Sequence, residues 1–533
     1  MFHGWKGDFH PKCGNVPEIT ARICRNETVL PGLGGSPMRA NIQSQARPLV
    51  DRRQLDASTA GVSKANKVPA ESAIVDRAVL WAFIAGLAWC PFWFGSNELL
   101  AWGINAVLFP GLVAVYELSL LTRGDRHPVA IRYIKLPAAL FAGVVLWILI
   151  QNATWTPEWL HHPIWQMSAD ALGRPVHGSI SVNRELTSLA LLRLITAASV
   201  FWLAIQLCRD ASRAGFLLWS IAAISCAYAA YGLFALAVTP GRILWFAKPH
   251  SHSVVTSTFI NPNSFASYAG MGFIAICGLV LNLYRHEFKA VGGSIRSRIA
   301  SFIEVTGQKG VLLLGGALVI LVAVLASGSR GGIASTALGL LVLGVLTLRL
   351  RKQQFAEQRE AIVVVGALLV AASFLVFGDI VAGKIAREGF GDEHRMAVYT
   401  IAIRSILDAP LLGYGYGSFA DVFPMFRDQS VSTSATWPMA HDTYLEVFQG
   451  LGLLFGSMLV ASVVVLVLRC VRGASTRQMN QTLPCVAASV ACLLGVHALV
   501  DFSLQMQAIA ITFMALLGAG VAQSDSSRLA LQD

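Results

Sequence analysis

Long apolar stretches separated by short polar connections run through most of the chain. A helix that crosses the roughly 30 Å hydrocarbon core of a bilayer needs about 20 mostly apolar residues. Twelve stretches approach this length: residues 78–95, 98–121, 136–152, 186–208, 214–238, 264–284, 311–327, 332–349, 361–380, 443–468, 483–500 and 504–521. The pattern predicts an all-α polytopic membrane protein with about 12 transmembrane helices. The seventh and eighth stretches, and the last two, are separated by very tight turns.

Composition supports this fold class. The chain has 533 residues, of which 55% are hydrophobic and 13% are charged, whereas soluble proteins carry about 25% charged residues. A soluble enzyme, a disordered scaffold and a secreted disulfide domain do not fit this balance. The nine cysteines form no CxxC pair and no Cys/His cluster with zinc spacing. They are interpreted as small apolar fillers and cytosolic thiols, and no cofactor is expected.

The basic residues are distributed unevenly between the two sets of loops. If the N-terminus is cytoplasmic, the loops on its side hold 18 Lys and Arg residues, and the longer opposite loops hold 10. Cytoplasmic loops collect Lys and Arg, so both termini are predicted to be cytoplasmic. The anionic inner leaflet then explains the formal net charge of +11, and no nucleic acid partner is needed.

Four regions follow from this organisation. Residues 1–76 are polar without a periodic apolar face and are predicted to be a disordered cytoplasmic tail. Residues 77–260 carry the N-terminal transmembrane helices. Residues 261–523 form a second transmembrane region that includes the large outer loop 381–442. Residues 524–533 form a cytoplasmic C-terminal tail.

The large outer loop is predicted to contain short helices. Residues 393–408 place Met396, Tyr399, Ile403 and Ile406 on one stripe, which predicts an amphipathic helix at the membrane interface. After Pro410, the glycine-rich run 413–417 predicts a flexible turn that lets the backbone approach a ligand closely.

Two arginines on the outer side are candidates for holding an anion. Arg330 is flanked by three glycines in the turn between the seventh and eighth stretches, where its planar fork and nearby backbone N–H groups suit a phosphate. An interfacial arginine in a glycine-dependent turn is the alternative. Arg395 lies at the start of the helix in the large loop, and its alternative role is a local ion pair with Asp392 or Glu393.

Further polar residues occur at helix starts or inside spans. His441 opens the tenth span, where a histidine titrates near neutrality and accepts a proton, although an exposed polar residue is the simpler interpretation. Asn263 precedes the sixth span and is an ordinary N-cap residue that also suits sugar hydroxyls. Arg193 lies within the fourth span, and an intramembrane charge is a functional candidate by default. Asp501 lies in the turn between the last two spans.

The ordered set of these motifs resembles the O-antigen ligase and polymerase superfamily. The motifs are Asn261-Pro-Asn263, Ser329-Arg-Gly331, Arg395 in the large loop, the PLLGYGYGSF turn, His441-Asp-x-x-Leu445 with Gly450-Leu-Gly452, and the closing HALVDFSLQ. The similarity covers roughly residues 185–520. Each motif is short, and their order around the large loop carries the resemblance.

The resemblance implies a metal-independent, inverting glycan transferase in the bacterial inner membrane with its active site facing the periplasm. The donor would be a glycan on undecaprenyl pyrophosphate, and the acceptor either lipid A–core or a growing lipid-linked glycan. By motif position, Arg330 and Arg395 correspond to the family's essential arginines and bind the pyrophosphate, and His441 corresponds to its essential histidine and acts as general base. Arg193, Asn263, Tyr414 and Tyr416 are secondary candidates for substrate contacts.

Two departures from the family pattern leave the acceptor open. Asp442 follows His441 where many members have Asn, and HALVDFSLQ is more similar to polymerase-like members than to ligases. A transporter of a small anion or of a lipid-linked sugar is the alternative from another class, because transporters of this size place ionisable residues near the membrane midplane. A structural membrane scaffold is a third alternative. Here the polar candidates concentrate on one face, which favours an enzyme.

Overall fold

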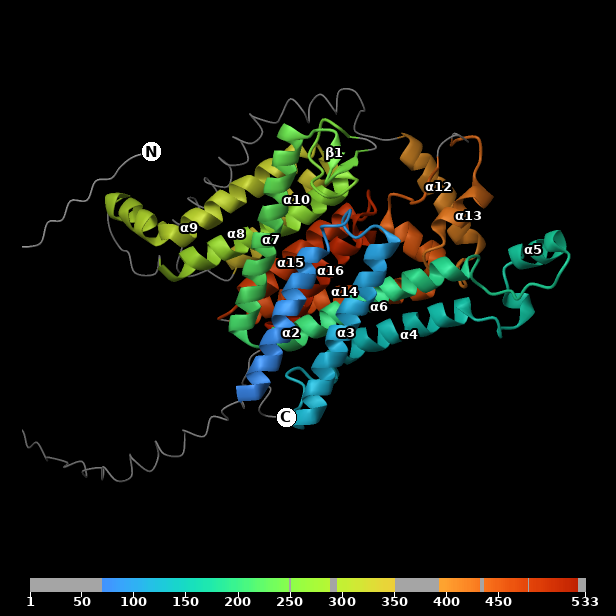
Figure 1. Ribbon diagram of the computed structural model, residues 1–533, viewed down its shortest axis with the longest axis horizontal. Helices are drawn as coiled ribbons and strands as arrows, with labels where there is room; N and C mark the ends of the chain where they lie inside the picture. The colour runs from blue at the N-terminus through green and yellow to red at the C-terminus, as the bar shows by residue number, and fades with distance from the viewer. Residues whose placement is uncertain are drawn as a thin grey trace, which may run out of the picture. The chain divides into compact units, whose positions relative to one another are not determined.

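The computed structural model describes residues 70–248, 251–287, 295–349, 393–431, 436–477 and 479–525. These residues form an almost entirely helical unit (Figure 1). Most of the predicted N-terminal tail and the predicted span 361–380 lie outside the described residues.

Helices coincide with the other eleven predicted spans. They are α2 (Ala70–Trp89), α3 (Leu99–Arg123), α4 (Lys135–Asn152), α6 (Arg184–Leu207), α7 (Ala211–Val238), α8 (Pro262–Glu287), α9 (Ile295–Ala326), α10 (Arg330–Arg349), α14 (Thr443–Thr476), α15 (Thr482–His497) and α16 (Gln507–Ala522). The start of α2 lies inside the segment 1–76 that the sequence assigns to the tail. Eight helices of the described chain are long and apolar enough to cross a membrane, and α15 and α16 are apolar but only 16 residues long. The chain is a multi-pass all-α membrane protein.

Shorter elements occupy the connections. They are η1 (Ile131–Ile134), η2 (Glu158–Leu160), α5 (Ile164–Leu172), the antiparallel pair β1 (Arg242–Ile243) and β2 (Phe246–Ala247), α12 (Glu393–Asp408), α13 (Phe419–Phe426) and η4 (Ser503–Gln505). In Figure 1, α12 and α13 lie together beyond the ends of the long helices, and α5 lies beyond α4 and α6.

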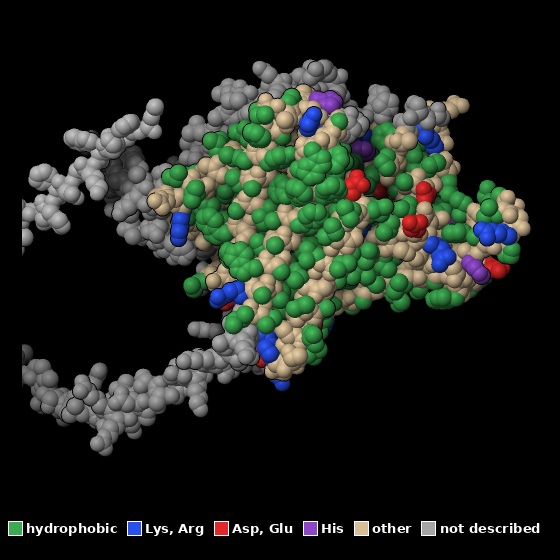
Figure 2. Space-filling model, in the orientation of Figure 1, with side chains coloured by type: hydrophobic (Ala, Val, Ile, Leu, Met, Phe, Trp, Pro, Cys, Tyr) green, Lys and Arg blue, Asp and Glu red, His purple; other side chains and the backbone are tan. Residues whose placement is uncertain are grey.

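The centre of the unit is built around α16, which is buried along nearly its whole length. It packs against α6 and α15, and small residues allow the close approach that helices in membranes favour. A Cβ atom on Gly518 would lie 2.7 Å from the carbonyl oxygen of Phe201 on α6. Outer helices expose large apolar side chains, such as Val107 and Leu121 on α3, and Figure 2 shows apolar side chains over the visible face. Apolar residues on both the inner and outer faces are the mark of a membrane helix.

The two predicted tight turns differ in the structure. The turn between α9 and α10 is short because Gly328 adopts a left-handed φ of +63° and Ser329 accepts a hydrogen bond from the N–H of Gly332 at 3.1 Å. The second turn is longer than predicted. Residues 498–506 separate α15 from α16, because this segment is pinned to other helices through Asp501.

The glycine-rich turn 413–417 packs backbone to backbone against a break in α14. The break is at Gly452, where φ is +74° and ψ is 171°. The N–H of Tyr414 donates to the carbonyl of Gln449 at 3.0 Å, and the N–H of Gly415 donates to that of Gly450 at 3.1 Å. A Cβ atom on Gly413 would lie 2.4 Å from the Gly450 oxygen. The glycines therefore allow the backbone of this turn to contact the backbone of α14 closely. The sequence predicted that the turn would approach a ligand closely.

Residues 393–408 form a helix as predicted. Of the predicted interfacial stripe, Met396 and Ile403 are 62% and 47% exposed and Ile406 is buried, while Val398, Ile401 and Ala402 are buried against α13. The partner helices come from other parts of the chain, so the periodicity of this short helix alone does not determine which face they cover.

Candidate functional site

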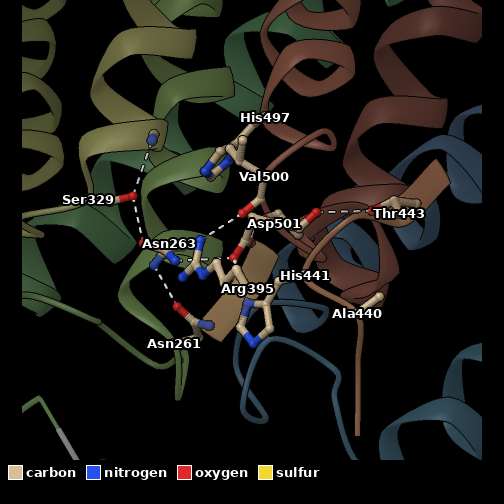
Figure 3. Close-up of polar contacts among 12 residues, drawn as sticks. Asn261, Asn263, Ser329, Arg395, Ala440, His441, Thr443, His497, Val500 and Asp501 are labelled. Atoms are coloured by element: carbon tan, nitrogen blue, oxygen red, sulfur yellow. Dashed lines mark hydrogen bonds and ion pairs between the residues drawn. The ribbon is translucent and has the colours of Figure 1, made fainter. Parts of the chain in front are cut away.

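The segment between α15 and α16 carries a buried carboxylate at the meeting point of several helix ends. The side chain of Asp501 is 1% exposed. Its Oδ1 accepts a hydrogen bond from the amide of Asn263 at 3.1 Å, and its Oδ2 accepts one from Ser503. Nδ1 of His441 lies 3.8 Å from Oδ1, at ion-pair distance. Figure 3 shows Asn263, Arg395 and His441 grouped around this carboxylate.

Asn263 connects Asp501 to the turn that carries Arg330. Its Oδ1 accepts a hydrogen bond from the hydroxyl of Ser329 at 2.8 Å, and its backbone N–H donates to the side chain of Asn261 at 2.8 Å. Since Ser329 also caps α10, Arg330 is placed as the first residue of that helix, next to Asn263. The amide of Asn263 thus bridges the starts of α8 and α10.

Gly331 fits this turn against a second histidine. A Cβ atom at position 331 would lie 3.0 Å from Cδ2 and Nε2 of His497, the last residue of α15. His497 is 1% exposed, and its Nδ1 is hydrogen-bonded to the hydroxyl of Ser267. The glycine after Arg330 is needed because the ring of His497 occupies the space that a side chain would fill.

His441 is held in an unusual backbone conformation beside Asp501. Its φ is +59°, a left-handed value that non-glycine residues rarely adopt and that often marks functional sites. Its carbonyl accepts a hydrogen bond from Tyr399 at 2.9 Å. The ring packs edge-on against Phe502 and Trp437, with centroids 4.7 and 5.8 Å away. Its side chain is 22% exposed, so the imidazole remains accessible.

The residues after His441 join α14 to the same segment. Asp442 caps α14 by accepting hydrogen bonds from the N–H groups of Tyr444 and Leu445 at 2.8 and 3.0 Å. The backbone N–H of Thr443 donates to Ala498 at 2.9 Å. Asp442 therefore serves the helix start, which gives a structural reason for a carboxylate directly after the histidine.

Arg395 reaches the site from α12. Its Nη1 donates to the carbonyl of Val500 at 2.9 Å, directly before Asp501. It also lies close enough to His497 to act on its charge. The two arginines expected to bind an anion, together with His441, thus come from three separate elements that meet around residues 497–503.

The family model described as O-antigen ligase matches residues 315–460, which contain Arg330, Arg395 and His441. The match supports a relationship of this part of the chain to the O-antigen ligase superfamily. No curated protein matches the chain. Together with the apolar helices, the match indicates a membrane enzyme of the glycan-transferring ligase or polymerase kind. Asn263 and Asp501 complete the site from outside the matched residues.

The electrostatics of this site favour an ionised Asp501. Burial by itself raises the pKa of this carboxyl group. Hydrogen bonds and the neighbouring imidazoles outweigh burial and hold the pKa below its usual value; the partners are His441, His497, Ser503 and Asn263. The pKa of Asp442 moves in the opposite direction, because desolvation is larger there than the effect of its two backbone hydrogen bonds. Asp501 is therefore the buried anion of the site.

Arg193 and Tyr416 form a second group with Glu446 and Gln505. The guanidinium of Arg193 donates to the backbone carbonyl of Gln505 and lies over the ring of Trp102, with Cζ 4.4 Å from its centroid. Arg193 also interacts electrostatically with both Tyr416 and Glu446. This group contacts the backbone next to the site, at Gln505 and at Ala440.

Tyr414 lies apart from both groups. It is 2% exposed, and its hydroxyl donates to Asp408 at 2.5 Å. Its ring packs edge-on against His162 of the first outer loop. In this structure Tyr414 joins two outer loops, and its hydroxyl is used within the protein.

Sequence reasoning did not assign functions to His497, Ser329 or Glu446, and it noted Asp501 without a partner. The signals were present, since His497 and Asp501 stand in the quoted HALVDFSLQ and Glu446 stands close after His441. Among the described residues, no group of three His, Cys, Asp or Glu side chains has the arrangement of a metal site.

Proposed function

We propose that the protein transfers an oligosaccharide or polysaccharide from undecaprenyl pyrophosphate to an acceptor sugar hydroxyl at the periplasmic face of the bacterial inner membrane. The acceptor is either lipid A–core or a growing lipid-linked glycan. The observation that carries the proposal is the meeting of Arg395, His441 and the Arg330 turn around Asp501.

The arginines bind the pyrophosphate. Arg330 is the first residue of α10, where the helix dipole and the first backbone N–H groups already favour an anion. A cation at this end of a helix adds to that positive potential. Arg395 supplies a second planar donor fork from α12. Both stabilise the negative charge that develops as the bond between C1 of the sugar and the phosphate oxygen breaks.

His441 acts as general base. Its Nδ1 lies toward Asp501, which leaves Nε2 to take the proton of the acceptor hydroxyl. The acceptor oxygen forms the new bond to C1, the pyrophosphate leaves with the electron pair of the broken bond, and the proton remains on His441. Asp501 stabilises the resulting imidazolium. Attack from the face opposite the pyrophosphate inverts the anomeric carbon.

Reconstitution of the full-length protein in nanodiscs tests this function. Lipid-linked oligosaccharide is supplied with or without lipid A–core, and products are separated by mass. Transfer to the core identifies a ligase, and chain growth without it identifies a polymerase. Because the arginines supply the positive charge, turnover is expected to persist in EDTA. If no product forms under either condition, the protein is not this transferase, and uptake by proteoliposomes then tests the transporter.

The variants R330A and H441A are the critical ones, and R404A is the matched control. Arg404 is an arginine of α12 whose side chain is 58% exposed and pairs with Asp428. Loss of turnover in the first two, with the fold retained and R404A active, supports the assigned roles. Full turnover in either variant removes that residue from the mechanism.

A further inference from the structure

The half-buried group around Arg193 and Glu446 touches both chain segments that carry the His441–Asp501 pair. The first segment contains Ala440, directly before His441, and the second contains Gln505, shortly after Asp501. The Ala440 segment donates a backbone hydrogen bond to Glu446, and the Gln505 segment accepts one from Arg193.

Glu446 holds the first segment. Its Oε1 accepts the backbone N–H of Ala440 at 2.6 Å, and Ala440 is completely buried. This distance is short for an N–H···O hydrogen bond. This bond fixes the residue before the left-handed turn at His441, while Tyr399 fixes the carbonyl after it. The backbone of His441 is thus constrained on both sides.

Arg193 holds the second segment. Its guanidinium donates to the carbonyl of Gln505 from α6, and the ring of Trp102 covers its face. The side chain of Gln505 in turn hydrogen-bonds to Glu446. Gln505 therefore contacts both Arg193 and Glu446, whose charges favour each other, and the two segments are joined through one half-buried polar group.

We propose that Arg193 and Glu446, linked through Gln505, form one clamp that positions His441 against Asp501. The proposal rests on the proposed function, because it treats this pair as the base and its carboxylate. Arg193 and Glu446 are positioning residues, since both act through backbone groups next to the pair. Their position on the apolar helices α6 and α14 makes the two residues interdependent, because removing one leaves the other without its partner.

A direct role for Arg193 as a third phosphate ligand is the competing explanation. A phosphate ligand acts on donor binding, so R193Q would raise KM for the lipid-linked donor, and E446Q would have little effect. A clamp acts on the geometry of the base. In that case R193Q and E446Q both lower kcat, leave KM nearly unchanged, and do not add in the double variant.

The test compares R193Q, E446Q, R193Q/E446Q and the conservative R193K in full-length protein reconstituted in nanodiscs. Each single variant is expected to lower kcat by about 10- to 100-fold, the order that misplacement of a catalytic group costs. The double variant is expected to lose no more than the worse single variant, and R193K to recover part of the loss. Multiplied losses, or a change in KM alone, would overturn the clamp.

A second readout does not depend on turnover. The rate at which diethyl pyrocarbonate modifies His441, followed by peptide mass spectrometry at one fixed pH, reports how firmly the ring is held. We expect it to rise several-fold in R193Q and E446Q and to be unchanged in R404Q. Unchanged reactivity in the clamp variants contradicts the inference. If the single variants fail to fold, the neutral double variant carries the test, and wild-type kcat in that protein disproves the clamp.

The two proposals fail in different ways. Turnover that survives in H441A removes the base mechanism, whatever the clamp does. Turnover lost in H441A but normal in R193Q and E446Q removes only the clamp.

Discussion

Arginines gather at both ends of the helical unit but are used differently. At one end, here the Asp76 end, Arg213 and Arg123 share the carboxylate of Asp76 at 3.0 and 3.3 Å. Arg209 and Arg477 there donate to backbone carbonyls at the C-terminal end of α16; the acceptors are Ala522, Gln523 and Asp525. Cations at the carbonyl end of a helix satisfy groups that the helix leaves unbonded.

At the other end, which we call the Asp501 end, an arginine stands at the N–H end of a helix and not at the carbonyl end. Arg330 begins α10, at the N–H end of a helix, and the buried carboxylate of Asp501 is surrounded by an amide, a hydroxyl and an imidazole. Positive charge at the Asp76 end satisfies the carbonyl ends of helices. Under the proposed function, positive charge at the Asp501 end binds an anion. The comparison leads to the proposal that the position of an arginine relative to a helix end separates structural from ligand-binding roles.

The largest effect is expected from the Asp501 end. R330A and H441A should each lower turnover by about 10³-fold, because one removes charge stabilisation and the other the proton acceptor. Turnover per folded molecule is the measurement, with R209A as the counterpart from the Asp76 end. If R209A lowers turnover as much as R330A does, the proposed division between the two ends is wrong.

Asp501 gives a smaller catalytic effect and a defined pH dependence. D501N should lower kcat by about 100-fold by releasing the imidazole from its orienting carboxylate.

The folded-state pKa of Asp501 lies below its unfolded value of about 3.9, so ionised Asp501 stabilises the fold at neutral pH. That contribution is lost as the pH falls through the folded-state pKa. The difference in thermal stability between wild type and D501N should be largest at pH 7 and should disappear as the pH falls below about 4. A difference that does not vary with pH would show that Asp501 stabilises the fold by packing alone.

Substitution in the glycine turn 413–417 should lower the stability of the fold. G413A places a Cβ atom 2.4 Å from the Gly450 carbonyl at a φ of +65°, and we expect a loss of at least about 2 kcal/mol from clash and left-handed strain together. Gly124 is the matched control, with a φ of +67° and nothing within 4 Å of the methyl group that alanine would add. G124A should lose only about 1 kcal/mol. Equal thermal shifts in the two variants would show that the contact with α14 is unimportant.

The smallest effect is expected from the Asp76 end. D76N weakens the contacts to Arg123 and Arg213, and the side chain of Asp76 is 18% exposed. The expected loss is about 1 kcal/mol of stability, with turnover per folded molecule unchanged. Thermal unfolding and the transfer assay on the same sample measure both quantities. A fall in turnover at constant stability would mean that the two ends are coupled.

Much of the fold follows from local sequence. Eleven apolar stretches coincide with helices because the length of an apolar run and its helical hydrogen bonding are local properties. The helix at 393–408 is local for the same reason. Its buried face was not predictable, because Val398 and Ala402 are covered by α13 and by the segment before His441.

Some residues of the candidate site could also be selected from the sequence, and others could not. Arg330, Arg395 and His441 could be selected from residue type and motif order, and the O-antigen ligase match covers all three. The partners of His441 could not be selected in this way. Asp501, the carboxylate that faces His441, is held by Asn263, which lies 238 positions away and meets it only through the packing of α8, α10 and α15.

The sequence by itself determined the fold class, the helix positions and the residue types available for binding an anion and accepting a proton. Tertiary structure alone decided which of them meet. It placed Asp501 beside His441, used the glycines of residues 413–417 to admit α14, and set Arg193 against Gln505 and Glu446 behind the site. The physical reason is that hydrophobicity and helix formation depend on near neighbours, whereas hydrogen bonds between helix ends depend on how distant helices pack.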